Sequence, residues 1–388
     1  MKNKYLLILV FFLGFVNDAS SQDTSSIDSK PGNSKFLIRG YSDATFSSGE
    51  GESTFGNARF IPVFLYKQSD KLFFEGELEF AMEEGELEVA LEYADFVYKL
   101  TPGVNLRAGK FLVPFGIFFD RLHPSWINRL PTNPLGYGHD GVLPTSDLGV
   151  ELRGASYLGS MKFNYSVYLT NGPQIEDGDH EPDEVGLIVH DPGIDNNNNK
   201  ALGGRFGLFP LKDQSFEIGF SFQSAKLGEQ ETELEEVGAM LYALDWTYVR
   251  NVSFLGGIID LKGQLNFINV DDYAYEVEED GETEVHNFEN KSKSAFFQFG
   301  YRPTFGESQF VKNLELVGRY STLNTPEEAP WESESKQTTI GLNYWIDWRT
   351  AIKLAYQKDN VIGGHVEEGE EAAETDISKF YVQWTLGF

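Results

Sequence analysis

The feature that most constrains the fold is an alternation of apolar and polar residues, which recurs from about residue 35 to the last residue. In segments of roughly 8 to 12 residues, every second side chain is apolar and the others are mixed, as expected for β-strands with two different faces. We predict sixteen strands, with each boundary good to about three residues. They cover residues 35–46, 57–67, 71–81, 87–99, 104–111, 147–155, 160–170, 201–209, 215–225, 238–249, 254–269, 293–303, 312–321, 337–346, 349–358 and 378–388.

The composition requires two different surroundings for the side chains. Aromatic residues make up 14% of the chain, yet the same chain carries 60 acidic residues. A membrane barrel reconciles these values, because its outer face carries an apolar band with aromatic girdles while its inner face is polar. No apolar run reaches the roughly 20 residues that a membrane helix needs. We therefore predict an all-β fold, a single transmembrane antiparallel β-barrel, which without cysteine must be stabilised by its closed hydrogen bonding.

The connections between the predicted strands alternate in length. Short ones such as 68–70 and 210–214 are followed by long ones such as 112–146, 171–200 and 270–292. This alternation is typical of a barrel with short periplasmic turns and long external loops. It requires an even number of strands and places both termini in the periplasm.

The N-terminus predicts export. Residues 1–21 read as a cleaved signal peptide, with two lysines, an apolar run at 5–16 and the small residues Ala19-Ser20-Ser21. Residues 22–34 are rich in Ser and Asp and predict a flexible periplasmic lead-in. The barrel occupies 35–388, and we expect the protein in the bacterial outer membrane.

The last strand carries the strongest local signal. Its apolar parity ends on a terminal phenylalanine, Phe388, after Phe380, Val382, Trp384 and Leu386. This pattern resembles the assembly signal of bacterial outer-membrane proteins. As the edge strand of a soluble sandwich it would promote aggregation, whereas a barrel pairs it with the first strand.

The 112–146 connection is unusually apolar for an external loop. It contains Phe115, Ile117, Phe118, Phe119, Trp126, Leu130 and Leu143. It also carries the charged residues Asp120, Arg121, Arg129 and Asp140. We predict that this third external loop folds into the lumen, where its aromatic residues pack against the wall. A folded external cap or a subunit contact is the alternative.

Two short motifs carry a resemblance to a known family. Residues 107–116, Arg-Ala-Gly-Lys-Phe-Leu-Val-Pro-Phe-Gly, resemble the strand-five signature of the phosphate-selective porins O and P. Residues 168–172, Tyr-Leu-Thr-Asn-Gly, also look like that family. Together with the strand layout, the resemblance covers most of residues 35–388. It implies a homotrimeric, sixteen-stranded porin with a constriction loop, and phosphate-like anions as solutes.

Strand parity predicts which charges face the lumen if the apolar parity faces lipid. The basic set is Arg39, Arg59, Arg107, Arg153, Arg205, Arg302, Arg319 and Lys353. The acidic set is Glu75, Glu77, Glu79, Glu88, Glu92 and Glu151. With Asp120, Arg121 and Arg129 of the loop, these are the candidate pore-lining residues. Because most of the glutamates lie on two adjacent strands, they predict an acidic wall that would orient polar solutes. The alternative is that neighbouring charges merely satisfy one another.

These patterns predict a non-enzymatic channel for passive or weakly selective diffusion of small hydrophilic, charged solutes. The formal net charge of −29 argues against nucleic acid. Acidic long loops predict contacts with outer-membrane lipid and lipopolysaccharide, directly or through divalent ions, or a solvated surface. A plugged receptor or adhesin acting through those loops is the alternative. An outer-membrane hydrolase is less favoured, because no Gly-x-Ser-x-Gly is present.

No cofactor is indicated by the sequence. All six histidines fall in predicted connections, without the helical pair typical of zinc hydrolases. The segment 191–199 offers a weak calcium candidate through Asp191 and Asp195, but it lacks the spacing of a known calcium loop and favours a turn-rich loop instead.

Overall fold

The computed structural model of the chain describes residues 35–83, 85–138, 141–179, 181–190, 193–279, 282–363 and 374–388. The predicted signal peptide, the predicted lead-in and Asp191 lie outside these residues. Among the described residues, no helix is long and apolar enough to cross a bilayer.

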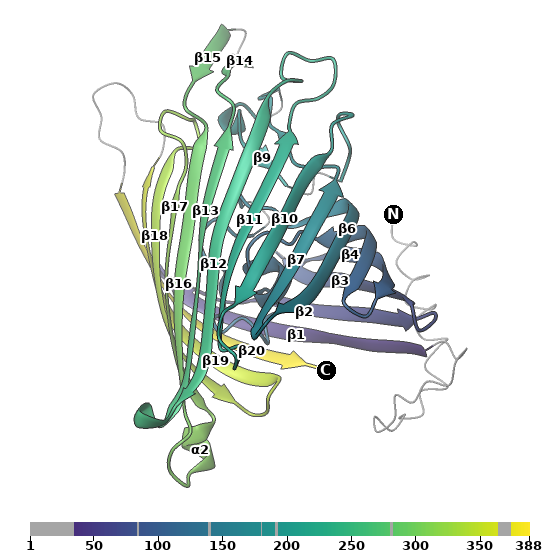
Figure 1. Cartoon of the computed structure of the whole chain (residues 1–388). Coiled ribbons are helices and arrows are strands. Elements are labelled where there is room, and N and C mark those ends of the chain that lie inside the picture. The colour runs from purple at the N-terminus through teal and green to yellow at the C-terminus, as the bar shows by residue number, and fades with distance from the viewer. Residues whose placement is uncertain are drawn as a thin grey trace, which may run out of the picture.

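Sixteen antiparallel strands close into one barrel, which confirms the predicted fold class (Figure 1). In chain order the barrel strands are β1 (Lys35–Gly49), β2 (Glu52–Lys67), β3 (Leu72–Glu83), β4 (Glu86–Thr101), β5 (Val104–Leu112), β6 (Ser146–Leu158), β7 (Met161–Thr170), β10 (Ala201–Phe209), β11 (Phe216–Lys226), β12 (Gly238–Val252), β13 (Gly257–Val270), β16 (Lys291–Pro303), β17 (Leu314–Asn324), β18 (Ser333–Trp345), β19 (Thr350–Gly363) and β20 (Glu374–Gly387). Each pairs with its neighbour in this order, and β20 pairs with β1.

The seam between β1 and β20 depends on the end of the chain. The backbone N–H of Phe388 donates to Gly40 O at 2.9 Å, and the N–H of Gly40 donates to Phe388 O at 3.2 Å. The Phe388 ring stacks on Phe60 of β2 at 5.8 Å between centroids. Gly40 has a φ of +154°, and a Cβ there would lie 2.2 Å from Ile61 O. The close approach that seals the barrel therefore requires glycine.

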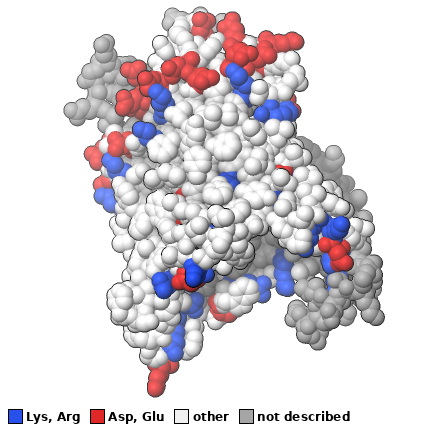
Figure 2. Space-filling view, viewed as in Figure 1, with Lys and Arg blue, Asp and Glu red and all other residues white. Residues whose placement is uncertain are grey.

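The two parities of each strand have different surroundings. On the outer parity large apolar side chains are exposed, for example Leu106, Leu152 and Val167 at 39%, 39% and 47%. On the inner parity polar side chains such as Ser221 and Gln264 are buried. Figure 2 shows a middle band of the outer surface that is largely free of charge, with acidic residues gathered at one end. This distribution is the one that a lipid bilayer requires of a barrel.

A bulge interrupts the alternation between β3 and β4. Glu77 pairs with Tyr93, but the next residue of β3, Leu78, pairs with Leu91. The extra residue of β4 is Glu92, and the faces of β4 change parity across it. Tyr93 and Asp95 therefore face the lumen on one side of the bulge. On the other side Glu88, which pairs with Ala81, faces it.

The long loops lie at one end of the barrel, as expected, but three connections depart from the alternation of short and long. β1 and β2 extend through the predicted 47–56 connection to a turn at Glu50 and Gly51, and β3 and β4 are also joined by a short connection. The strands stay paired beyond the apolar band, because the hydrogen bonds between them do not require alternating apolar residues. At the opposite end the 304–313 connection contains a helical turn, α2 (Gln309–Lys312), and is longer than a tight turn (Figure 1).

The connections at the long-loop end pack on one another. β14 (Ala274–Glu279) and β15 (Glu282–Asn287) form a hairpin in the 271–290 connection, and β8 (Gln174–Ile175) pairs with β9 (Ile188–Val189) in 171–200. Val185, Tyr275 and Phe288 form a small apolar cluster. Trp331 Nε1 donates to Val185 O at 2.9 Å. The 171–200, 271–290 and 325–332 connections thus form a packed cap over part of the barrel end.

Candidate functional site

The 113–145 loop runs inside the barrel. At its start the N–H of Gly116 donates to Ser221 Oγ of β11 at 2.9 Å, and the N–H of Ile117 donates to Gln264 Oε1 of β13 at 2.8 Å. Gly116 has a φ of +68°, and a Cβ there would lie 1.9 Å from the Gln264 side chain. The loop can approach the wall this closely only because residue 116 is glycine. The motif at 107–116 is therefore the end of β5 together with the start of this loop.

Apolar contacts hold the same part of the loop. Phe115, Ile117 and Phe118, each no more than 2% exposed, join a cluster with lumen-facing residues of β12, β13 and β16 such as Leu241 and Phe296. Burial of each large side chain contributes about 1.5 to 3 kcal/mol. The strand alternation predicts a polar inner face, but this part of the wall is apolar where it meets the loop, because the aromatic residues of the loop need apolar partners.

Two buried cations hold the second half of the loop. Lys353 of β19, at 0% exposure, donates from Nζ to Ser125 O at 2.5 Å, Asn128 O at 2.7 Å and Gln383 Oε1 at 2.8 Å. Arg319 of β17, at 2% exposure, donates to Thr132 O, Thr132 Oγ1 and Asn133 O at 2.8 to 2.9 Å. Both residues are on the lumen-facing parity, but the loop covers them.

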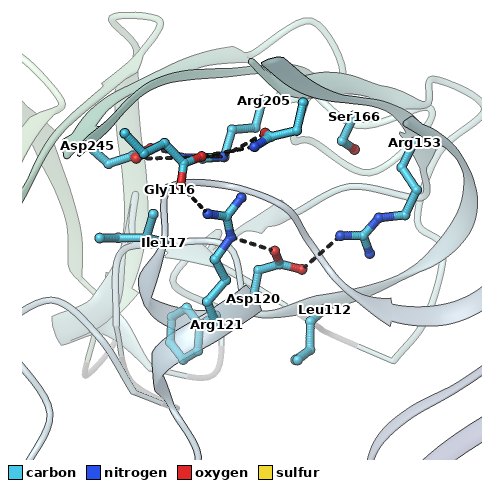
Figure 3. A network of polar contacts seen from close by, with 12 residues as sticks. Leu112, Gly116, Ile117, Asp120, Arg121, Arg153, Ser166, Arg205 and Asp245 are labelled. Atoms are coloured by element: carbon cyan, nitrogen blue, oxygen red, sulfur yellow. Dashed lines mark hydrogen bonds and ion pairs between the residues drawn. The ribbon is translucent and has the colours of Figure 1, made fainter. Parts of the chain in front are cut away.

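A chain of alternating charges crosses the lumen beside the loop (Figure 3). From β12 to β4 it runs Asp245, Arg205, Glu217, Arg121, Asp120, Arg153, Glu151, Arg107 and Asp95. Asp120 and Arg121 come from the loop, and the other members come from β4, β5, β6, β10, β11 and β12. Opposite charges therefore lie side by side, and the loop joins the walls through them.

In the chain of charges, the contacts near β10 are short. Arg205 donates to Asp245 at 2.5 and 2.9 Å and to Glu217 at 3.1 and 3.2 Å, and all three side chains are almost fully buried. The paired glycines Gly207 and Gly219 make room for this cluster, since a Cβ on either would lie 2.4 Å from one of its charged atoms. Glu217 also accepts from Arg121 of the loop at 2.8 Å.

In the chain of charges, both contacts of Arg153 are long. Its Nη2 lies 3.7 Å from Asp120 Oδ1 and its Nε lies 3.6 Å from Glu151 Oε1, which are ion-pair rather than hydrogen-bond distances. The side chain is 36% exposed, the largest value in the chain of charges. Beyond it, Glu151 and Arg107 form a buried pair at 2.5 Å.

Two cavities meet at Arg153. One of about 350 Å³ lies towards the short-turn end, beside Gly103, Asn164 and Tyr165. The other, of about 400 Å³, is lined on one side by Glu75 and Glu77 of β3. Asp120, Arg121 and Arg153 line both cavities. A solute moving along this side of the lumen would therefore pass those three side chains.

The acidic side of the second cavity includes Glu77, which accepts from Tyr41 Oη at 3.1 Å. His123 of the loop places Nε2 3.7 Å from Glu77 Oε1. Burial lowers the pKa of His123, but the neighbouring Glu77 carboxylate outweighs it and holds this pKa above its ordinary value. The carboxylate thus stabilises the charged form of the imidazole.

The other predicted charges lie elsewhere in the barrel. Arg59 pairs with Asp43 at 3.0 Å and lies 3.6 Å from Glu79. Arg129 lies 3.4 Å from Glu315 and 4.8 Å from the Trp345 ring centre. Arg302 donates to Lys312 O near the short-turn end. Arg39 is half-buried on β1, Glu88 is exposed on β4, and Glu92 is the bulge residue. The structure does not bring these residues into the charge chain.

Sequence reasoning missed three acidic members of the chain of charges: Asp95, Glu217 and Asp245. Glu217 and Asp245 lie on the polar parity of their predicted strands, so they could have been included with Arg205. Asp95 could not, because its parity relative to Glu88 depends on the bulge at Glu92.

The weak calcium candidate has another partner. Both carboxylate oxygens of Asp195 accept from Lys200 Nζ, at 2.6 and 2.8 Å. Neighbouring asparagines bond to the next loop, as when Asn196 Nδ2 donates to Leu227 O at 3.0 Å. Within the described ranges no group of three metal-ligating side chains is present.

The packed cap is expected to loosen in acid. His190 donates from Nε2 to Val142 O at 3.3 Å, and burial lowers its pKa to about 4. Between pH of about 6.5 and about 4 the unfolded segment binds a proton that the folded segment does not, so stability falls as the pH falls. The hydrogen-exchange protection factors of residues 141–143 and 185–190, which compare each rate with that of the unfolded chain at the same pH, should fall over this range. In His190→Gln, which can still donate but does not titrate, they should not; an equal fall in both proteins would contradict this account.

No family model matches the sequence, and no curated protein does. Membership in the phosphate-selective porin family therefore stays a prediction. Solved structures with a similar fold include the outer-membrane channel DcaP of Acinetobacter baumannii, at 10% identity and a TM-score of 0.57, covering 92% of this chain and 97% of that one.

OmpF of Salmonella typhi, solved with daunomycin, is 14% identical with a TM-score of 0.55, and the match covers 92% of this chain and 98% of that one. An anion-selective porin from Comamonas acidovorans is also 14% identical with a TM-score of 0.55, covering 92% and 100%. At these identities the likeness concerns the fold.

Proposed function

We propose that this protein is an outer-membrane porin through which small hydrophilic solutes diffuse. The observation that carries the proposal is the pair of cavities with charged side chains in their lining, about 350 and 400 Å³, that meet at Arg153 inside a closed barrel. The largely uncharged outer band supports a position in a bilayer. Sixteen strands are enough to leave an aqueous channel. The long loops would face the outside, and export would use the predicted signal peptide.

The channel is proposed to be weakly selective rather than phosphate-selective. The arginines of the charge chain all lie within 4.0 Å of carboxylates, so a phosphate ion would have to compete with these partners. The chain of charges contains one more carboxylate than guanidinium, and Glu75 and Glu77 add to this excess. A mild preference for cations follows.

A homotrimer is proposed as the assembly. The barrel fold recurs in a trimer form of OmpT from Vibrio cholerae, at 11% identity and a TM-score of 0.51, covering 92% of this chain and 99% of that one. Cross-linking in native membranes, followed by electrophoresis without heating, tests this assembly.

Conductance in a planar bilayer tests the channel itself. The refolded protein is expected to give discrete current steps in KCl. A tenfold salt gradient at pH 7 should give a small reversal potential, with the sign that indicates preferential permeation of cations. A receptor with a plugged lumen would give no steps, which would refute the channel. Strong anion selectivity at low salt would refute the selectivity but leave the channel standing.

A further inference from the structure

We infer that the cavity between Glu75 and Arg153 is a binding site for small zwitterions, whose carboxylate contacts Arg153 and whose ammonium contacts Glu75. The inference rests on the proposed channel and names a class of solute that the channel would favour. It requires an accessible guanidinium and an accessible carboxylate, separated from each other and facing one cavity.

Arg153 can accept a solute carboxylate. Its side chain is 36% exposed and lines both cavities, and its guanidinium makes only ion-pair contacts longer than 3.5 Å within the described part of the chain. Its donors can therefore turn to a bidentate contact with a solute carboxylate. Arg107 cannot do this, because it is 7% exposed and is held by Glu151 at 2.5 Å.

Glu75 can accept a solute ammonium. It faces the same cavity from β3, and no hydrogen bond or ion pair joins it to another described residue. Glu77, on the same face of β3, is already engaged by Tyr41 and lies beside His123. β4 and β5 separate β3 from β6 in the sheet, so the two solute-binding charges are placed on different parts of the wall.

The charges that line this cavity favour a zwitterion over a simple ion. Three carboxylates (Glu75, Glu77 and Asp120) and three arginines (Arg107, Arg121 and Arg153) line it, together with His123 and Tyr93. A simple anion in the cavity would lie near the carboxylates, and a simple cation would lie near the arginines. A solute that carries both charges can satisfy the two sides together.

The test compares 4-aminobutanoate with molecules that carry one of its charges or neither. Butylammonium, butanoate and butanamide are the three comparison molecules, added at pH 7 to the protein in a planar bilayer with KCl. The zwitterion should halve the current at a concentration about tenfold below that of any of the three, which corresponds to about 1.4 kcal/mol. Equal blocking concentrations would overturn the inference.

Two variants assign the contacts. Glu75→Gln should weaken the block by 4-aminobutanoate to that of butanoate, and Arg153→Gln should weaken it to that of butylammonium. Glu307→Gln and Arg250→Gln make the same chemical changes in or next to turns at the short-turn end, away from the cavity, and should leave the block unchanged. Heat-modifiable electrophoretic mobility checks that each variant is folded. A block that neither cavity variant alters would overturn the site.

Failure of the channel and failure of the site can be told apart. A protein that conducts KCl without preferring the zwitterion overturns only the site. If the protein does not conduct, titration calorimetry of 4-aminobutanoate with the folded protein in detergent still tests the site. Heat of binding that is lost in Glu75→Gln and Arg153→Gln supports it, and no heat in the unmodified protein overturns it.

Discussion

Replacing Lys353 by methionine is expected to release the second half of the lumen loop and to raise the single-channel conductance. The ammonium of Lys353 is fully buried and holds the carbonyls of Ser125 and Asn128 as well as the Gln383 side chain. Methionine has a similar length but cannot donate, so three buried acceptors would lose their partner. Each unsatisfied group costs about 1 to 3 kcal/mol, which is enough to detach this segment.

The first half of the loop should stay seated in Lys353→Met, because the apolar cluster around Phe115 and Phe118 does not involve residue 353. The expected result is therefore a wider channel in an intact barrel. Faster trypsin cleavage after Arg129, in the released segment, gives a second readout. The double variant Lys353→Met with Arg319→Met should show a larger effect on both, since Arg319 holds the adjacent residues Thr132 and Asn133.

Lys358→Met is the matched control for this experiment. Lys358 lies on the same strand, but its side chain is half exposed and pairs with Asp376 outside the lumen. Its replacement should change neither conductance nor cleavage. If Lys353→Met behaves like this control, the buried ammonium does not hold the loop.

Replacing Arg205 by methionine is expected to destabilise the barrel by about 3 to 5 kcal/mol, because it leaves two buried carboxylates without their shared cation. Asp245 is 0% exposed and receives two hydrogen bonds from Arg205. Glu217 retains Arg121 and Asn164, so the loss falls mainly on Asp245. Unfolding in urea, followed by the loss of heat-modifiable mobility, measures the change.

The second substitution Asp245→Asn should restore part of the stability lost in Arg205→Met, because it removes the uncompensated charge. Arg250→Met provides the control, since Arg250 is 53% exposed and pairs with Asp213 at 3.6 Å. An exposed pair of this kind contributes about 0 to 1 kcal/mol. Equal destabilisation by Arg205→Met and Arg250→Met would show that the buried cluster makes no special contribution.

Much of the barrel could be predicted from the sequence because its signals are local. The predicted strands each overlap one of the sixteen in the barrel, since alternation reports the two faces of each strand directly. The end of β1 and the start of β2 lie outside the predicted ranges, because strands that continue past the apolar band lose that alternation. A separate error of parity lies at the bulge of Glu92, where one extra residue changes the parity of β4.

The sequence by itself determined that the chain forms a barrel, which faces of its strands are apolar, and that residues 112–146 are too apolar to lie free in water. Only the tertiary structure decided which charges meet. Arg205 contacts Asp245 two strands away, and Arg153 contacts Asp120 of the loop. These contacts depend on the register of several strands and on the path of the loop through the lumen. Alternation within one strand carries no information about either, because every lumen-facing charge obeys the same parity whichever partner it finds.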